Sequence, residues 1–234
     1  MKNGISLVIP AYQEEENLRF LLPQIHNALK ETGQTYEILV IDTCQPMDHT
    51  EEACKEHNAL CIRCKDNDSY GNATRTGILH AQYDKMVIMD GDGSHRPDVI
   101  PQMFERMEKE NLDLVVGSRY VKGGNSANGP ILKLLSVILN LVFRWTFHLT
   151  VKDLSGSFRM YRTEQLKKME LLSDNFDIIE EILIKLSMQD QFRFAEVPIS
   201  FSKRHAGESK RHLFAFISGY LATIVRLKRI CRKK

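Results

Sequence analysis

The chain has 234 residues, of which 43% are hydrophobic and 26% are charged, as in an ordinary globular protein. This length fits one domain, or one domain with a short accessory piece. Residues 1–3 lead directly into the apolar run 4–10, which is too short for a signal peptide and predicts a buried first strand. The odd number of cysteines, five, favours reduced thiols in the cytosol over a disulfide framework.

The net charge of +2 conceals an asymmetry along the chain. Residues 203–234 contain ten Lys or Arg and a single acid, so the rest of the chain is acidic. A basic end of this kind suits an anionic surface such as phosphate, nucleic acid or acidic lipid, although a solvated tail has the same composition.

The first half alternates short apolar runs with helical patterns. We expect strands at residues 4–10, 37–41, 59–63, 86–89 and 112–116, and helices at 14–30, 47–58, 72–83 and 98–109. Strands that are apolar throughout and separated by helices predict a doubly wound, mostly parallel α/β sheet with helices on both faces. Such sheets bind ligands beyond the carboxyl ends of their strands.

The second half breaks this alternation. Residues 122–130 are rich in Gly, Asn and Ser, which indicates a loop, and 131–149 form a long apolar stretch. Residues 213–225 carry no charge and precede a basic cluster, the pattern of an amphipathic helix on an anionic membrane surface. A helix packed on the core with a solvated basic end has the same pattern. Neither run reaches the about 20 apolar residues that span a bilayer. We therefore expect a catalytic domain at 1–212 and a basic helix or tail at 213–234.

The Cys61–Cys64 pair has the C-x-x-C spacing, but no second ligand pair accompanies it. Small buried residues at a strand end explain it better than zinc. The sequence 90–93, Asp-Gly-Asp-Gly, is a stronger metal candidate because it directly follows a buried strand. Two carboxylates two residues apart can hold Mg²⁺ or Mn²⁺ against substrate phosphates, and the glycines let the backbone turn.

Polar groups follow other expected strands: Tyr12 and Glu14 after the first, Asp42 after the second and Arg119 after the fifth. Each suits a cap or a surface ion pair when taken alone. Together on one rim they predict a pocket for a nucleotide diphosphate, in which the guanidinium holds phosphate.

Several segments carry a family resemblance. LVIPAYQEEENL at 7–18, GNATRTG at 71–77 and DGDGSHRP at 90–97 resemble family 2 glycosyltransferases of GT-A fold. DLSGSFRMYR at 153–162 and EVPISF at 196–201, followed by R-x-x-GESK at 204–210, resemble the dolichyl- or polyprenyl-phosphate mannosyltransferase branch.

This resemblance implies roles for individual residues. It implies donor-nucleotide contacts at the ends of the first, second and fourth strands, namely Pro10, Tyr12, Glu14, Ile41, Thr43, Gly91 and Asp92. It implies a metal held by Asp90 and Asp92, with Ser94 near a third, weaker position. It implies phosphate contacts from basic and hydroxyl side chains, namely Arg119, Lys133, Arg204, Ser209 and Lys210, with Arg119 and Arg204 counted with the two aspartates as catalytic.

One position departs from the family pattern. The family has two consecutive aspartates after its second strand, and this chain has Asp42 followed by Thr43. The second aspartate contacts the base or ribose in the family, so the resemblance does not identify the donor base here.

The reaction implied is an inverting transfer of a hexose, of mannose or glucose type, from a nucleotide-diphosphate sugar to a polyprenyl or dolichyl phosphate. A lipid phosphate is already anionic at neutral pH and needs no general base. An alcohol acceptor on a glycan, lipid or small molecule would need one, with Asp153 or Glu180 as candidates. The third alternative is a catalytically impaired, membrane-attached subunit.

The implied setting is the cytoplasmic face of a membrane, on which the chain lies as a peripheral protein. The partners expected are the sugar donor, the lipid acceptor and the membrane surface, without nucleic acid. Whether a separate membrane protein also holds the chain stays open at this stage.

Overall fold

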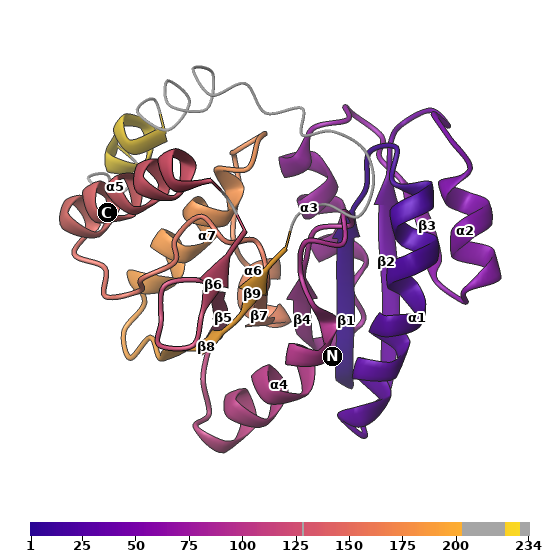
Figure 1. Ribbon diagram of the computed structural model, residues 1–234, viewed down its shortest axis with the longest axis horizontal. Coiled ribbons are helices and arrows are strands. Elements are labelled where there is room, and N and C mark those ends of the chain that lie inside the picture. Colours follow the sequence, from indigo (N-terminus) through magenta and orange to yellow (C-terminus); the bar gives the residue numbers. More distant parts are fainter. Residues whose placement is uncertain (128, 203–222, 230–234) are drawn as a thin grey trace.

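The structure is a computed structural model that describes residues 1–127, 129–202 and 223–229. A seven-stranded sheet forms its centre, in the order β3-β2-β1-β4-β7-β5-β8 (Figure 1). Its neighbouring strands are parallel except at β7, which runs antiparallel to both β4 and β5. The strands of the sheet are β1 (Lys2–Pro10), β2 (Tyr36–Asp42), β3 (Leu60–Arg63), β4 (Tyr83–Ile88), β5 (Leu114–Ser118), β7 (Arg159–Arg162) and β8 (Phe194–Pro198).

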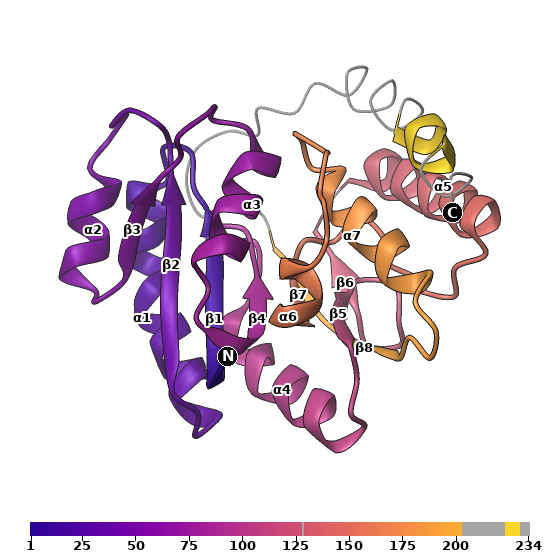
Figure 2. The ribbon, with the colours of Figure 1, turned by 180° about the vertical axis from the view of Figure 1, so that it is seen from behind.

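Helices cover both faces of this sheet (Figures 1 and 2). One core contains residues of α1 (Glu15–Glu31), α2 (Thr50–Glu56) and α4 (Ile100–Lys109), with the short helix η1 (Pro97–Val99) before α4. The opposite core contains residues of α3 (Tyr70–His80), α5 (Pro130–Phe147), α6 (Thr163–Lys167) and α7 (Ile178–Ser187). A small second sheet pairs β6 (Asn125–Ser126) with β9 (Ser200–Phe201) in parallel.

Strand β1 shows why the sheet is buried on both faces. Successive side chains of a strand point to opposite faces. Leu7 and Ile9 lie in the core under α1, whereas Val8 lies in the core under α3. All three are fully buried, so the apolar run in the sequence reflects two cores and not one.

The parallel register brings the carboxyl ends of β1, β2 and β4 to one edge. Pro10 is opposite Ile41, and Val8 is opposite Ile88. Because β7 is antiparallel, its first residue, Arg159, lies at this same edge, opposite Ile88. The segment 153–158 before β7 therefore lies at the same edge of the sheet as the loops that follow β1, β2 and β4.

The predicted fold class is confirmed, with differences at element ends. The third predicted helix extends too far: α3 ends at His80, and Tyr83 begins β4. Gln82 and Tyr83 instead donate backbone hydrogen bonds to Glu37 and to the Ser6 hydroxyl. The fifth strand is shifted to Leu114–Ser118, and β7 was not among the expected strands.

The predicted C-terminal helix lies partly within the described residues. Residues 223–229 are helical and lie beside α5 in both views (Figures 1 and 2). Leu227 is buried in the same core as Phe143 of α5, so this end of the chain packs on the domain. In the part of the chain that the structure describes, no helix combines the length and the apolar character that crossing a membrane requires.

Candidate functional site

The segment after β4 begins with Asp90, whose side chain lies half-buried at the carboxyl edge of the sheet. Its Oδ1 accepts a hydrogen bond from the Tyr70 hydroxyl at 3.1 Å. The backbone N–H of Asp90 donates to Nδ1 of His95 at 3.4 Å. The Asp90 carboxylate is therefore oriented by Tyr70 of α3, and the Asp90 backbone is held by His95 of its own loop.

The second carboxylate, that of Asp92, is held by Ser94, which the family resemblance places near the expected metal. Oδ1 of Asp92 accepts from both the backbone N–H and the hydroxyl of Ser94, at 3.0 and 2.5 Å. Gly93 between them has a φ of +74°, a conformation in which glycine carries no steric cost. Ser94 thus orients the Asp92 carboxylate in this structure.

Gly91 lies against the loop that follows β1. A Cβ at this position would lie 3.0 Å from Ile9 Cγ2 and 3.8 Å from Glu14 Cβ. The structure thus brings together Gly91 and Glu14, two of the predicted donor-binding residues. Glu14 is nearly buried and accepts a hydrogen bond from Asn17, whereas the Tyr12 ring is 40% exposed at the same loop.

Two carboxylates at a strand end suit a divalent cation that prefers oxygen ligands. Among the described residues, no group of three or more His, Cys, Asp or Glu side chains is arranged to hold a metal ion. The described residues therefore do not form a metal site made of protein ligands alone. The pair Asp90 and Asp92 fits the other arrangement known for Mg²⁺, in which substrate phosphates and water supply the remaining ligands.

His95 is buried between aromatic rings directly beneath this turn. Its ring lies 5.2 Å from that of Phe158 and 5.3 Å from that of Phe201, measured between centroids. Burial lowers the pKa of His95, and the charges of Asp90 and Asp92 oppose that shift only in part. We therefore treat His95 as a neutral acceptor that holds the turn.

Thr43, in the loop after β2, stands where the family has its second aspartate. The buried Thr43 hydroxyl donates to the backbone oxygen of Gln45 at 2.6 Å. Asp42 accepts from the Thr43 N–H and from Arg63, and its burial raises the pKa of its carboxyl. The buried Thr43 side chain therefore stabilises the loop that follows β2. Ile41 is also fully buried, and its backbone oxygen accepts from Ala11 N, just after β1.

Arg119 follows β5, and its guanidinium makes a two-point ion pair with Asp153. The Nε–Oδ2 distance is 2.8 Å and the Nη2–Oδ1 distance is 2.7 Å. The Arg119 backbone N–H donates to Asp153 as well, and Gly156 N–H donates to its Oδ1. Asp153 therefore fastens the loop before β7 to the end of β5.

The remaining predicted residues are placed unequally. Pro10 ends β1 at the site edge. Lys133 lies in the first turn of α5, and its side chain is outside the described part of the structure. Arg204, Ser209 and Lys210 lie outside the described residues. The chain leading to them is described as far as Ser202, whose N–H donates to the backbone oxygen of Ser94 at 2.9 Å.

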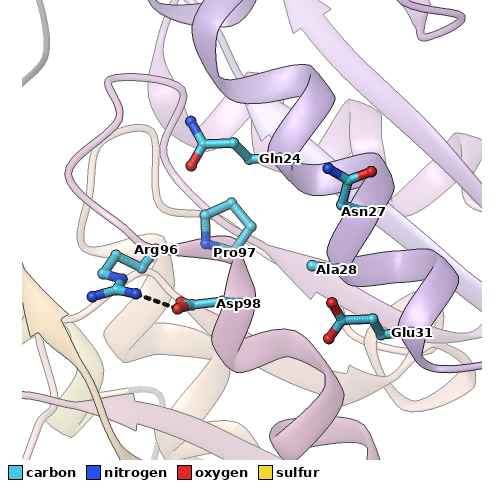
Figure 3. A pocket seen from close by; sticks show the side chains of 7 residues that line it. All are labelled: Gln24, Asn27, Ala28, Glu31, Arg96, Pro97 and Asp98. Carbon is cyan, nitrogen blue, oxygen red and sulfur yellow. Dashed lines mark hydrogen bonds and ion pairs between the residues drawn. The ribbon is translucent and has the colours of Figure 1, made fainter.

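Sequence reasoning missed Tyr70 and the roles of His95 and Asp153. A hollow of about 210 Å³ also lies nearby, between α1 and the start of η1 (Figure 3). None of the predicted site residues lines it. Its lining is mostly polar and includes the ion pair of Arg96 with Asp98; the residues are Gln24, Asn27, Ala28, Glu31, Arg96, Pro97 and Asp98.

Comparison with known proteins finds relatives over most of the chain. The chain is 36% identical to dolichol-phosphate mannosyltransferase of Pyrococcus furiosus, over 88% of this chain and 58% of that protein. It therefore spans less than two thirds of that relative's length. It is 32% identical to undecaprenyl-phosphate mannosyltransferase of Micrococcus luteus, over 87% of this chain and 85% of that protein.

The fold is also that of a solved enzyme. Glucosyl-3-phosphoglycerate synthase from Mycobacterium tuberculosis, in complex with Mn²⁺, UDP and phosphoglyceric acid, superposes with a TM-score of 0.77. The match covers 96% of this chain and 78% of that one at 18% identity, so it bears on the fold alone. The family model described as glycosyl transferase family 2 matches residues 6–169, and the chain belongs to this family.

Proposed function

We propose that this protein is a metal-dependent, inverting glycosyltransferase that transfers a hexose from a nucleotide-diphosphate sugar to a polyprenyl-type lipid phosphate. The observation that carries the proposal is the Asp90–Asp92 turn at the carboxyl edge of the sheet, with Ser202 bonded to it. The segment 203–210 directly follows Ser202 in the chain. It contains three basic residues, Lys203, Arg204 and Lys210. The names of the relatives supply the acceptor class.

The donor diphosphate is assigned to the edge formed by the loops after β1 and β4. Asp90 and Asp92 would hold Mg²⁺ or Mn²⁺ there, with Ser94 keeping Asp92 in place. When bound, the cation neutralises charge that develops on the departing nucleotide diphosphate. The exposed Tyr12 ring offers a surface on which a base can stack, and nearby Glu14 offers a hydrogen-bond acceptor.

The acceptor phosphate needs positive charge and no base, because it is anionic at neutral pH. Asp153 compensates the charge of Arg119, so we assign Arg119 chiefly to positioning the loop before β7. The larger share of phosphate binding then falls to Lys133, Arg204, Ser209 and Lys210.

An alcohol acceptor fits the described residues less well. Asp153 has both oxygens engaged by Arg119 and Gly156 and is fully buried. Glu180 is only 1% exposed, on the first turn of α7. Neither carboxylate meets the requirement that a general base reach the proton it removes.

The membrane surface is assigned to α5 and the neighbouring residues 223–229. Five apolar side chains of α5 are exposed at helical spacing: Leu134, Ile138, Leu141, Val142 and Trp145. Lys228 and Arg229 are exposed on the adjacent segment. An apolar helix face beside basic residues is the pattern of a helix lying in an anionic interface. The free thiols of the four described cysteines suit the cytoplasmic side.

The proposal is tested by incubating the protein with Mn²⁺, polyprenyl phosphate and a panel of nucleotide sugars while nucleotide release is measured. We expect release with one or a few donors, dependent on metal and lipid phosphate. Asp90→Asn and Asp92→Asn should abolish it while the circular dichroism spectrum stays unchanged. Turnover by either variant without divalent metal would refute the metal-dependent mechanism. Transfer to an alcohol but not to lipid phosphate would establish the alternative acceptor, and release from no donor would favour a non-catalytic subunit.

A further inference from the structure

Among the described residues, Tyr70, the first residue of α3, is the one side chain from outside the loop that is hydrogen-bonded to the Asp90 carboxylate. The two residues are 20 positions apart, and the hydroxyl–Oδ1 distance is 3.1 Å. Ser157, in the segment before β7, also lies close enough to the phenol to act on its pKa, which it lowers. Tyr70 thus lies between the metal-binding turn and the loop that Asp153 fastens.

The ring of Tyr70 is fixed by stacking. Its centroid lies 4.0 Å from that of Phe176, with 21° between the two planes. Stacking at this distance restricts the ring to a narrow range of orientations. The hydroxyl is therefore held at one position in front of Asp90.

The loop that carries Phe176 is itself tied to α3. Gly71 N–H donates to the backbone oxygen of Asp174 at 2.7 Å, and Arg75 donates to the backbone oxygen of Ser173 at 2.6 Å. A Cβ on Gly71 would lie 2.1 Å from Ser173 O, so only glycine permits this approach. Arg226, near the end of the chain, bonds to the Ser173 hydroxyl and adds a further anchor.

The phenol is a donor under all ordinary conditions. A tyrosine hydroxyl keeps its proton at neutral pH, and an ionised carboxylate such as that of Asp90 can only accept. A hydrogen bond from a neutral donor to a carboxylate restricts its rotation and leaves its charge in place for a cation. Partners of this kind behind metal ligands commonly contribute 10- to 100-fold in metal affinity.

We propose that Tyr70 is a positioning residue for the metal site, which orients the Asp90 carboxylate through its hydroxyl while Phe176 fixes its ring. This inference rests on the proposed function, because it takes Asp90 as a metal ligand. It adds a residue that the Asp-Gly-Asp pattern does not contain. It also joins the metal site to the 173–177 loop and, through Arg226, to the C-terminal segment.

The test is the affinity for Mn²⁺ in the presence of a nucleoside diphosphate, measured by electron paramagnetic resonance of the free ion. Tyr70→Phe keeps the stack on Phe176 and removes only the hydroxyl. We expect it to raise the Kd for Mn²⁺ about tenfold. In the transfer assay it should raise the Mn²⁺ concentration needed for half-maximal rate, and saturating Mn²⁺ should restore most of kcat. General structural damage would not be reversed by metal.

Tyr36→Phe is the matched control, since it also removes a phenol hydroxyl with a single described partner, His26, away from the site. Its Kd should equal that of the parent protein. Phe176→Leu retains the Tyr70 hydroxyl but removes the stack, and it should weaken Mn²⁺ binding in the same direction. It serves as the deciding variant if Tyr70→Phe does not fold.

The outcomes separate the two hypotheses. If Asp90→Asn abolishes Mn²⁺ binding but Tyr70→Phe leaves the Kd within twofold of the parent, the positioning role is wrong and the metal site stands. If Asp90→Asn leaves Mn²⁺ binding unchanged, the proposed metal site fails and the role of Tyr70 fails with it.

Discussion

Arg119 and Asp153 form a buried, two-point ion pair across 34 residues of sequence. The Asp153 side chain is fully buried and that of Arg119 is 9% exposed. The pair joins the carboxyl end of β5 to the start of the loop before β7. Its removal therefore tests both stability and the geometry of that loop.

Asp153→Asn should lower the free energy of unfolding by about 3 kcal/mol, because it leaves a buried guanidinium without its counter-charge. Urea denaturation at pH 7 measures this change. Glu164→Gln is the control, since the Lys168–Glu164 pair is about 70% exposed on both sides and should contribute nothing measurable. Equal midpoints for Asp153→Asn and the parent would show that the pair is not a structural fastener.

Gly77→Ala tests the close packing of α3 on β1. A Cβ at Gly77 would lie 2.2 Å from Cγ1 of Val8, a fully buried side chain in the middle of the sheet. Overpacking of this kind costs about 1–3 kcal/mol, which should lower the melting temperature. Gly129→Ala is the control, because nothing lies within 4 Å of a Cβ there. A melting temperature as high as that of the parent would mean that α3 can shift without cost.

The strand ends were predictable because each buried run stops where polar residues begin. Residues 86–89 are apolar, and Asp90 follows them, so the sequence alone places the turn at the edge of a sheet. Strand β7 was not predictable in this way. It has only four residues and contains Arg159, which is fully buried and donates to backbone oxygens of Gly156 and Ile179. In a sequence pattern, an arginine indicates an exposed position, so a buried arginine that donates to carbonyl oxygens conceals a core strand.

The Tyr70–Asp90 contact illustrates the other limit of sequence reasoning. Each residue lies at an element end that the sequence locates to within a few positions. Their contact depends on how closely the 173–177 loop approaches Gly71, which is a tertiary property. The predicted donor residues Glu14 and Gly91 meet because both follow parallel strands of one sheet, and that rule can be applied to sequence.

His95 should make stability fall as the solution is acidified. Its pKa in the folded protein is lowered by burial below the ordinary value of 6.5. Below about pH 6.5 the unfolded chain therefore binds a proton that the folded chain does not, so acidification favours unfolding. This contribution is absent at higher pH and reaches at most about 1.4 kcal/mol per pH unit.

The comparison of His95→Gln with the parent isolates this effect. Urea denaturation from pH 7.5 to 5 should give a steeper loss of stability for the parent than for the variant. His80→Gln is the matched control, since His80 is exposed on the last turn of α3 and should leave the slope of the parent unchanged. Identical slopes for His95→Gln and the parent would show that the neutral, buried state of His95 does not influence stability.

Trp145 provides a direct test of the proposed membrane surface. It is the single tryptophan of the chain, and its side chain is 81% exposed on α5. If α5 enters the interface, its fluorescence should shift to shorter wavelength with vesicles that contain anionic phospholipid, and less with zwitterionic ones. Leu141→Asp, one turn away on the same helix, should weaken vesicle binding about tenfold or more, since burial of a leucine contributes about 1.5–3 kcal/mol.

Leu79→Asp is the control for that experiment, because Leu79 is also an exposed leucine (72%, against 54% for Leu141) and lies on α3, outside the α5 surface. It introduces the same charge into the protein, so a general electrostatic repulsion from anionic lipid would weaken binding of both variants equally. A selective loss in Leu141→Asp requires that α5 itself contacts the bilayer. An unshifted Trp145 spectrum at saturating lipid would instead place this helix in water, and the apolar face would then need another partner.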